Sequence, residues 1–372
     1  MRCPVKKNPI KLTVLIVMLL GLPLSGIVLV GKPISMFLEF PPKTLYVEKA
    51  SFSWVVFIVY SLFISGSISP FVWQILKKPG RGYNEPCLGR CPWWGYLGLL
   101  LGIAAWILAW SRFPWFEKFQ PHTFTPLWLS YILSANALTH RRTGHCPMVD
   151  QPLSFLILFP LSAAFWWFFE YLNRFVQNWR YVGVELSPPE YFIYATLSFS
   201  TVLPAFISTR QWLLSFSWFE ERIQGFPPFH TPHPRMLAAL TLLAAGMGLL
   251  FLGVLPNYFF SLLWVSPLLI LISLQALMRE KHLCSAIAYG DWRAILGSAL
   301  AALVCGFFWE MWNYYSLAKW MYRVPFVQRF QIFEMPLLGY AGYLPFGAQC
   351  AVIVDMVFRK EKRPGLSRTV AG

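Results

Sequence analysis

Two short patterns in the sequence place a carboxylic acid and an amide beside aromatic residues. Glu170, Asn173 and Gln177 are spaced i, i+3 and i+7, and Glu310 and Asn313 repeat the first two of these positions. On one continuous helix such residues share a face. The four residues before Glu170 are all aromatic. An acid kept protonated among rings can act as a general acid, and a neighbouring amide can orient it by hydrogen bonding.

Each pattern is followed by an aromatic, basic connector that contains a second acid. Rings buried at a lipid interface with Arg or Lys at phosphate level are typical of a segment lying in the membrane surface, where it could cap a cavity. The candidate catalytic residues are Glu170, Glu310, Asn173, Asn313, Glu190 and Glu334. The candidate substrate-binding residues are Trp167, Trp179, Tyr181, Trp309, Trp320 and Tyr322.

Structural roles explain several of these residues equally well. Glu170 and Glu310 could fix helix ends at the headgroup level by pairing with Arg174, Arg180 or Lys319. Glu190 follows a proline and suits the first turn of a helix, where its carboxylate meets the positive end of the helix dipole. Both interpretations stay open at the level of sequence.

The sequence gives no reason to expect a metal ion or a cofactor. His230 and His233 have HxxH spacing, but they lie in GFPPFHTPHP, where the prolines disfavour a helix. We find no glycine-rich phosphate loop and no Ser/His/Asp ordering.

Composition identifies the class of protein. Of the 372 residues, 57% are hydrophobic and only 13% charged, against about one quarter charged in soluble domains. The net charge of +15 does not indicate nucleic acid, because the basic residues sit in short loops between apolar runs. We therefore expect an all-α polytopic membrane protein whose partners are membrane lipids and a hydrophobic small molecule. The sequence leaves its oligomeric state open.

About ten transmembrane helices are predicted, because a span needs about 20 mostly apolar residues. Their cores are residues 12–30, 51–75, 93–110, 123–139, 152–172, 191–209, 236–255, 257–278, 294–317 and 335–357. With the N-terminus inside, the inner segments carry 21 Lys and Arg and the outer ones 10, which together make the 31 of the chain. We expect a bacterial inner-membrane protein with both termini cytoplasmic.

The chain also contains an internal repeat of four predicted helices. Trp128 matches Trp264, and further along the chain Glu170 and Asn173 match Glu310 and Asn313 in the same order. Four helices are an even number, so both copies should share one orientation and open on the same, outer side. The predicted organisation is two N-terminal helices and a basic loop (1–92), a first repeat (93–210), a second repeat (234–358) and a basic tail (359–372).

One stretch resembles the membrane lycopene cyclase domain family of carotenoid synthesis. The matching residues are Glu170, Trp179, Tyr181, Pro188 and Glu190, followed by YFIYATLSFSTVLPAF. The resemblance implies acid-initiated cyclisation of an isoprenoid without net redox change. That family usually has Asp at the position of Glu170, Glu-Glu at Glu190-Tyr191, and a repeat of three helices. Residues 309–347 also look like uncharacterised bacterial polytopic membrane proteins.

Two functions fit these features. The first is a membrane enzyme that uses carboxylate acid/base chemistry on a lipid or isoprenoid. The second is a proton-coupled transporter or a non-catalytic membrane scaffold, since parallel repeats and buried carboxylates occur in transporters too.

Overall fold

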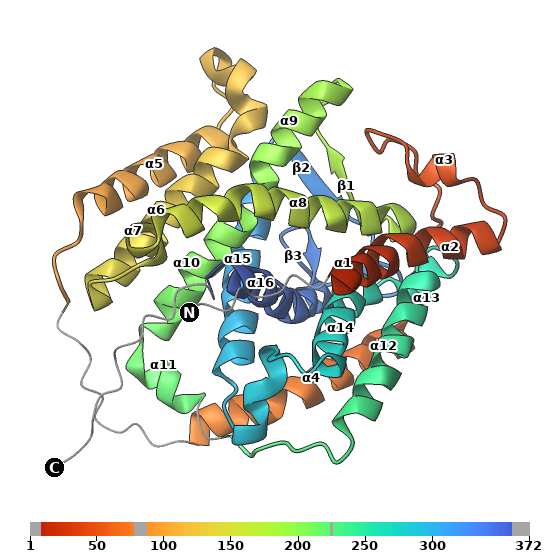
Figure 1. Cartoon of the computed structure of the whole chain (residues 1–372). Helices are drawn as coiled ribbons and strands as arrows, with labels where there is room; N and C mark the ends of the chain where they lie inside the picture. Colours follow the sequence, from red (N-terminus) through yellow and green to blue (C-terminus); the bar gives the residue numbers. More distant parts are fainter. Residues whose placement is uncertain (1–8, 78–87, 224–225, 359–372) are drawn as a thin grey trace, which may run out of the picture.

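Helices make up nearly all of the regular structure in the computed structural model, which describes residues 9–77, 88–223 and 226–358 (Figure 1). The basic tail, 359–372, and residues 1–8 and 78–87 of the N-terminal part lie outside the described residues. The helices are α1 (Pro9–Ile16), η1 (Val17–Gly21), α2 (Leu22–Leu29), α3 (Ile34–Phe37), α4 (Trp54–Lys77), α5 (Trp93–Trp110), η2 (Pro114–His122), α6 (Phe124–Thr143), α7 (Pro147–Asp150), α8 (Pro152–Val176), α9 (Pro188–Phe199), α10 (Val202–Leu214), α11 (Ser217–Arg222), α12 (Pro234–Leu250), α13 (Pro256–Phe259), α14 (Leu262–Leu277), η3 (Leu283–Tyr289), α15 (Arg293–Tyr315), η4 (Leu337–Gly342) and α16 (Tyr343–Phe358).

Within the described residues, 7 segments are long and apolar enough to cross a membrane. They are Lys11–Leu29, Trp54–Lys77, Trp93–Trp110, Pro152–Val176, Pro188–Leu214, Arg293–Tyr315 and Leu337–Phe358. The chain is therefore a multi-pass helical protein of membrane type. Helices also form at the other three predicted spans. However, α12 and α14 have only 17 and 16 residues, and α6 ends in His140, Arg141 and Arg142. A count of ten spans stays a prediction.

Small residues let neighbouring helices approach closely in two hairpins. In the α5–α6 hairpin, a Cβ on Gly95 would lie 2.5 Å from the Cβ of Ala137. In the α12–α14 hairpin, a Cβ on Gly248 would lie 2.8 Å from both Leu262 and Ser266. Backbone approach of this kind is what holds helices together where lipid removes the hydrophobic driving force.

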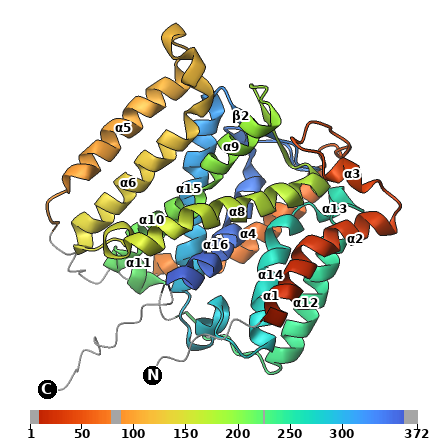
Figure 2. The ribbon, with the colours of Figure 1, turned by 45° about the horizontal axis from the view of Figure 1, so that its top comes forward.

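The two hairpins pack on the rest of the bundle in the same manner. Helix α6 packs on α10, and α14 packs on α16; α10 in turn contacts α15, and α16 contacts α8. The N-terminal α1–α2 segment lies against α14 and α12 (Figure 2). In the same view the start of α1 and the end of α16 lie at one end of the bundle, whereas β2 (Lys319–Tyr322) lies at the other.

Helix α4 is bound to the bundle mainly at its two ends, and none of its residues is buried. Near its start, the rings of Trp54 and Phe57 contact Phe330. Near its end, Phe71 contacts Phe226 and Trp292. The middle of α4 therefore connects these two contact regions and is itself only loosely packed against the rest of the molecule.

Candidate functional site

The two connectors pair with each other as a short antiparallel ribbon, although the sequence predicts segments lying flat in the interface. Strand β1 (Trp179–Val182) runs against β2, with Trp179 opposite Tyr322 and Tyr181 opposite Trp320. Side chains alternate along a strand, so these four aromatic residues project from one face of the ribbon. Aromatic residues at every second position are a strand signal, but here it is weak because each segment is so short.

Asn173 and Asn313 fold the chain back from each helix into its strand. The Asn173 amide donates to the Trp179 carbonyl at 2.8 Å and accepts from the Asn178 backbone N–H at 2.8 Å. Asn313 donates to the Trp320 carbonyl at 2.8 Å and accepts from the Trp320 N–H at 2.9 Å. The sequence predicts that these amides orient the acids directly; in the structure they position the strands whose rings contact the acids.

Glu170 lies at the centre of a set of aromatic hydrogen-bond donors and is 6% exposed. One of its oxygens, Oε1, accepts from Trp166 Nε1 at 3.1 Å, Trp179 Nε1 at 3.0 Å and the Tyr181 hydroxyl at 2.6 Å. Trp166 stands one helical turn before Glu170, which is the (i, i+4) relationship that brings side chains together on a helix.

Glu310 is completely buried and has a different set of donors. Its Oε1 accepts from the hydroxyls of Tyr322 at 2.7 Å and Tyr343 at 2.6 Å. Trp320 donates to the Tyr322 oxygen at 3.0 Å instead of reaching the carboxyl group. Glu310 Oε2 has no hydrogen-bond partner among the described residues.

Large and small side chains exchange places between the surroundings of Glu170 and those of Glu310. This exchange accounts for the different hydrogen-bond donors of the two acids. Trp166 and Gly306 occupy similar positions, because Trp166 stands four residues before Glu170 and Gly306 four residues before Glu310. Val202 and Tyr343 correspond as well, since each follows the first residue of its own Trp-x-Tyr strand motif at the same distance. A Cβ on Gly306 would lie 2.5 Å from the Tyr343 ring. Because Gly306 on α15 has no side chain, the phenol of Tyr343 on α16 occupies the space that an indole would need. The hydrogen-bond donor to Glu310 therefore comes from the neighbouring helix.

Trp128 and Trp264 make equivalent contacts across the middle of the bundle. Trp128 packs on Trp309 with ring centroids 5.0 Å apart, and Trp264 stacks on Phe169 at 5.1 Å. Phe169 and Trp309 occupy similar positions in the sequence, because each directly precedes its acid. Trp128 therefore packs against the residue that precedes Glu310, and Trp264 packs against the residue that precedes Glu170.

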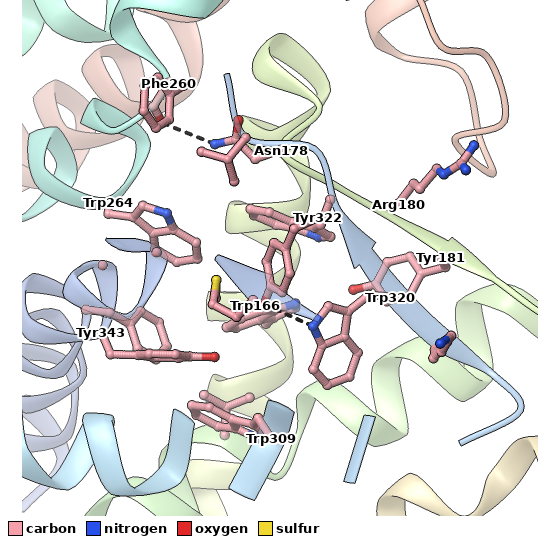
Figure 3. Close-up of a pocket in the computed structure, with 18 of the residues that line it drawn as sticks. Trp166, Asn178, Arg180, Tyr181, Phe260, Trp264, Trp309, Trp320, Tyr322 and Tyr343 are labelled. Atoms are coloured by element: carbon pink, nitrogen blue, oxygen red, sulfur yellow. Dashed lines mark hydrogen bonds between the residues drawn. The ribbon is translucent and has the colours of Figure 1, made fainter. Parts of the chain in front are cut away.

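A cavity of about 900 Å³ lies beside these two acids (Figure 3). Its wall contains the rings that hydrogen-bond to the carboxyl groups, together with other aromatic residues: Trp166, Trp179, Tyr181, Trp264, Trp309, Trp320, Tyr322 and Tyr343. The two carboxyl groups stand behind these rings and are not part of the lining. A volume near the upper end of the usual range for ligand pockets, with mostly apolar walls, suits a large hydrophobic molecule.

The surroundings of the two ribbon tyrosines favour their protonated form. Burial and the neighbouring Glu170 raise the pKa of Tyr181 well above its ordinary value, and burial and Glu310 do the same for the pKa of Tyr322. Both phenols are therefore neutral hydrogen-bond donors whose oxygen can also accept a proton.

Three sequence-predicted polar residues lie away from the two acids. Gln177 has a positive φ of 50° where α8 has ended, so it cannot share a helix face with Glu170; its amide instead binds the loop at Thr44 and Tyr46. Glu190 is exposed and forms a capping box with Ser187. Glu334 forms an ion pair with Lys319 at 2.6 Å.

Five of the six aromatic residues that the sequence predicts to bind substrate lie in the wall of the cavity. Trp179, Tyr181, Trp309, Trp320 and Tyr322 line the cavity, whereas Trp167 points to α9 and donates to Thr196 at 3.0 Å. The residues that the sequence analysis missed are Trp166, Trp264 and Tyr343. Trp166 could have been found from its spacing to Glu170. Tyr343 could not, because it lies 33 residues after Glu310 and nothing in its neighbourhood indicates the contact.

Within the part of the chain that the structure describes, no group of three or more His, Cys, Asp or Glu side chains could hold a metal ion. Comparison with known proteins adds no relative: no family model, no curated protein and no solved structure matches this chain.

Proposed function

We propose that this chain is a membrane enzyme that moves protons to and from an unsaturated hydrophobic substrate, with Glu310 as the acid and Glu170 as the base. The observation that supports this most is the position of the tyrosines. Tyr322 and Tyr343 each hydrogen-bond to the enclosed Glu310 and also line the cavity, and Tyr181 does the same for Glu170. A proton can thus pass between a sealed acid and a substrate through one phenol.

The two carboxyl groups differ in the way that acid and base roles require. Three donors converge on one oxygen of Glu170, and these donors favour the ionised form of the carboxyl group against the opposing effect of its burial. Glu310 has two donors on one oxygen, and its second oxygen is fully buried with no partner among the described residues. A buried, unpartnered oxygen costs less on a neutral acid than on a carboxylate. Two acids whose surroundings favour different protonation states can serve as the acid and the base of one reaction.

Each proton that moves in the proposed reaction has a donor and an acceptor. In the first step Glu310 donates its proton to the Tyr343 oxygen, which reverses the hydrogen bond of the resting structure, while Tyr343 gives its own proton to one carbon of a substrate double bond. A carbocation and an ionised Glu310 remain. A neighbouring C–H bond of the cation then loses its proton to the oxygen of Tyr181, which passes its own proton to Glu170. The product is an isomerised or cyclised alkene with no net redox change, and exchange with water resets both acids.

The aromatic walls suit the cation that this reaction forms. Trp166, Trp264 and Trp309 present rings to the same cavity (Figure 3). Ring faces attract a cation by about 0.5 to 2 kcal/mol each, most strongly where water is excluded. The resemblance to lycopene cyclases, which implies acid-initiated cyclisation, favours the same chemistry.

We further infer that the two acid centres arose by duplication of one four-helix unit, in a protein of ten spans with both ends on the cytoplasmic side of a bacterial inner membrane. The reciprocal contacts support this inference: α6 with α10 and α14 with α16, the paired strands, and the two asparagines that form the same turn. The unequal donors then reflect divergence of the two copies.

The test is expression of the chain in a bacterial host followed by untargeted lipid and pigment analysis. Membranes with wild-type protein should contain a product that is absent with Glu310→Gln and with Glu170→Gln, while both variants accumulate in the membrane as folded protein. An unchanged profile for Glu310→Gln would overturn the proposal. A substrate-dependent proton flux in proteoliposomes, lost in the same variants without any product, would instead identify a transporter.

A further inference from the structure

We infer that the cavity binds a single-chain amphiphile with an anionic head group, which enters from the bilayer past the middle of α4. This inference rests on the proposed function and names the substrate class for the same site. It draws on two features that the acid chemistry does not use: the distribution of charge around the cavity and the position of α4.

The charged residues of the lining give it a basic character. Lys43, Arg180 and Lys319 line the cavity, and among the described lining residues Glu185 is the one acid beside them. Lys319 is already paired with Glu334. Arg180 is exposed and has no acidic partner among the described residues, so its guanidinium is available to an anionic group.

The ribbon places two of these cations together. Arg180 stands opposite Met321, and Lys319 stands opposite Val182. The cations thus project from the ribbon face opposite the aromatic one and are diagonal neighbours about 7 to 8 Å apart at their backbones. Long side chains at this spacing can reach one phosphate or carboxylate from two sides. The cavity lining includes both faces of the ribbon, so head group and chain can occupy one continuous space.

The opposite wall of the cavity is helix α4, which offers no charge. Its lining residues are Tyr60, Phe63, Ile64, Ser67 and Ile68. From Tyr60 to Ile68, the first and last of these residues, the helix rises by about 12 Å, because each residue adds about 1.5 Å. This length suits a hydrocarbon chain lying along α4, parallel to the lipid chains outside.

The weak attachment of α4 provides the entry. The ring contacts of α4 with the bundle lie at its two ends and at Tyr60, whose ring centroid is 6.3 Å from that of Phe260, and its remaining middle residues separate the cavity from the surroundings. Leu62 and Val59, on its other face, are 69% and 60% exposed, as expected for residues in contact with lipid. A single chain can slip past such a helix without opening the packed part of the bundle.

The inference can be tested by photolabelling the purified full chain in phosphatidylcholine nanodiscs. The probe is a long-chain alkyl phosphate that carries a diazirine, and the labelled residues are mapped by mass spectrometry. We expect labelling of α4 within residues 60–68, saturable and displaced by unlabelled alkyl phosphate. An alkyl alcohol of the same length and inorganic phosphate alone should compete at least tenfold less well, since the loss of a charged hydrogen bond corresponds to about 1.5 to 3 kcal/mol.

Matched variants separate the head group from the chain. Arg180→Gln should weaken alkyl phosphate about tenfold and leave alkyl alcohol unchanged. Ile64→Trp places an indole in the part of the cavity that runs along α4 and should weaken labelling there, whereas Leu62→Trp, which faces lipid, should label as the wild type does. Equal binding of phosphate and alcohol, or labelling that resists Ile64→Trp, would overturn the inference.

The photolabelling experiment tests binding separately from the proposed reaction. Specific labelling without any product difference for Glu310→Gln would preserve the binding site and contradict the proposed reaction. A Glu310-dependent product without preference for the anionic probe would preserve the reaction and contradict the substrate class.

Discussion

The ring of Tyr343 packs directly against Gly306, so closely that a Cβ at Gly306 would lie 2.5 Å from two of its ring atoms. This contact holds the Tyr343 hydroxyl at 2.6 Å from Glu310. The acid on α15 thus obtains its donor from α16 only because its own helix lacks a side chain one turn earlier. Four positions, Trp166, Val202, Gly306 and Tyr343, together determine which acid receives which donor.

Gly306→Ala should destabilise the protein by about 1 to 3 kcal/mol, the usual cost of an inserted methyl group in a packed interior. It should also move Tyr343 away from Glu310 and reduce turnover. Thermal unfolding in detergent measures the first effect. Gly66→Ala is the control, because no neighbouring atom lies within 4 Å of its added Cβ. Equal stability of the two variants would contradict the packing described for Gly306.

The exchange of large and small side chains between the two acid centres predicts that two substitutions, each made to match the other acid, compensate one another. Gly306→Trp alone should prevent folding, since the indole needs the space of the Tyr343 ring. Gly306→Trp combined with Tyr343→Val reproduces the arrangement at Glu170 and should recover folded protein, measured as the monodisperse fraction in size-exclusion chromatography. A double variant that folds no better than the single one would show that the correspondence of the two acid centres is incomplete.

Asn313→Ala should destabilise the fold by about 2 to 4 kcal/mol. The change removes hydrogen bonds at 2.8 and 2.9 Å and takes this partner from the partly buried N–H and carbonyl of Trp320. Asn313→Asp keeps the acceptor and should recover part of the loss. Ser61→Ala, which removes only a hydrogen bond to the carbonyl one turn earlier in α4, should have little effect. Normal stability of Asn313→Ala combined with lost turnover would mean that the amide acts on the substrate.

Glu190→Ala should lower stability slightly and leave turnover intact, because the carboxylate only closes a capping box with Ser187. The unfolding temperature and the product yield are measured together. Loss of product at unchanged stability would restore Glu190 as a catalytic residue, the role that the sequence left open.

Lys49 should make stability depend on pH. Burial, with a smaller contribution from Arg323, lowers the pKa of Lys49 to about 7 in the fold. The unfolded chain therefore binds more protons between about pH 7 and the ordinary lysine pKa of about 10.4, and stability rises with pH across that range, by at most about 1.4 kcal/mol per unit. Unfolding of the wild type should show this rise, and Lys49→Met should lack it, whereas Lys118→Met at an exposed site should retain it. A wild-type curve parallel to that of Lys49→Met would contradict the pKa shift.

The sequence predicts the helical membrane architecture and both buried acids, because carboxylates inside apolar runs are rare and stand out. Five of the aromatic residues that it singles out line the cavity: Trp309, which directly precedes Glu310, and Trp179, Tyr181, Trp320 and Tyr322, which follow the two acids. It does not predict the ribbon, since each strand is stabilised by a partner in the other half of the chain, as Trp179 is by Tyr322. For the same reason it misses Tyr343: a contact between α15 and α16 depends on the space left by Gly306, and local patterns carry no information about such space.

The most direct test of the proposed proton transfer is deuterium incorporation. Isolated membranes that contain the wild-type protein, incubated with their substrate in D₂O, should release product that carries one solvent deuterium on carbon, because the exchangeable proton of Glu310 reaches the substrate through Tyr343. Glu310→Gln should give no deuterated product. Product that forms without deuterium, or deuterated product from Glu310→Gln, would contradict the account.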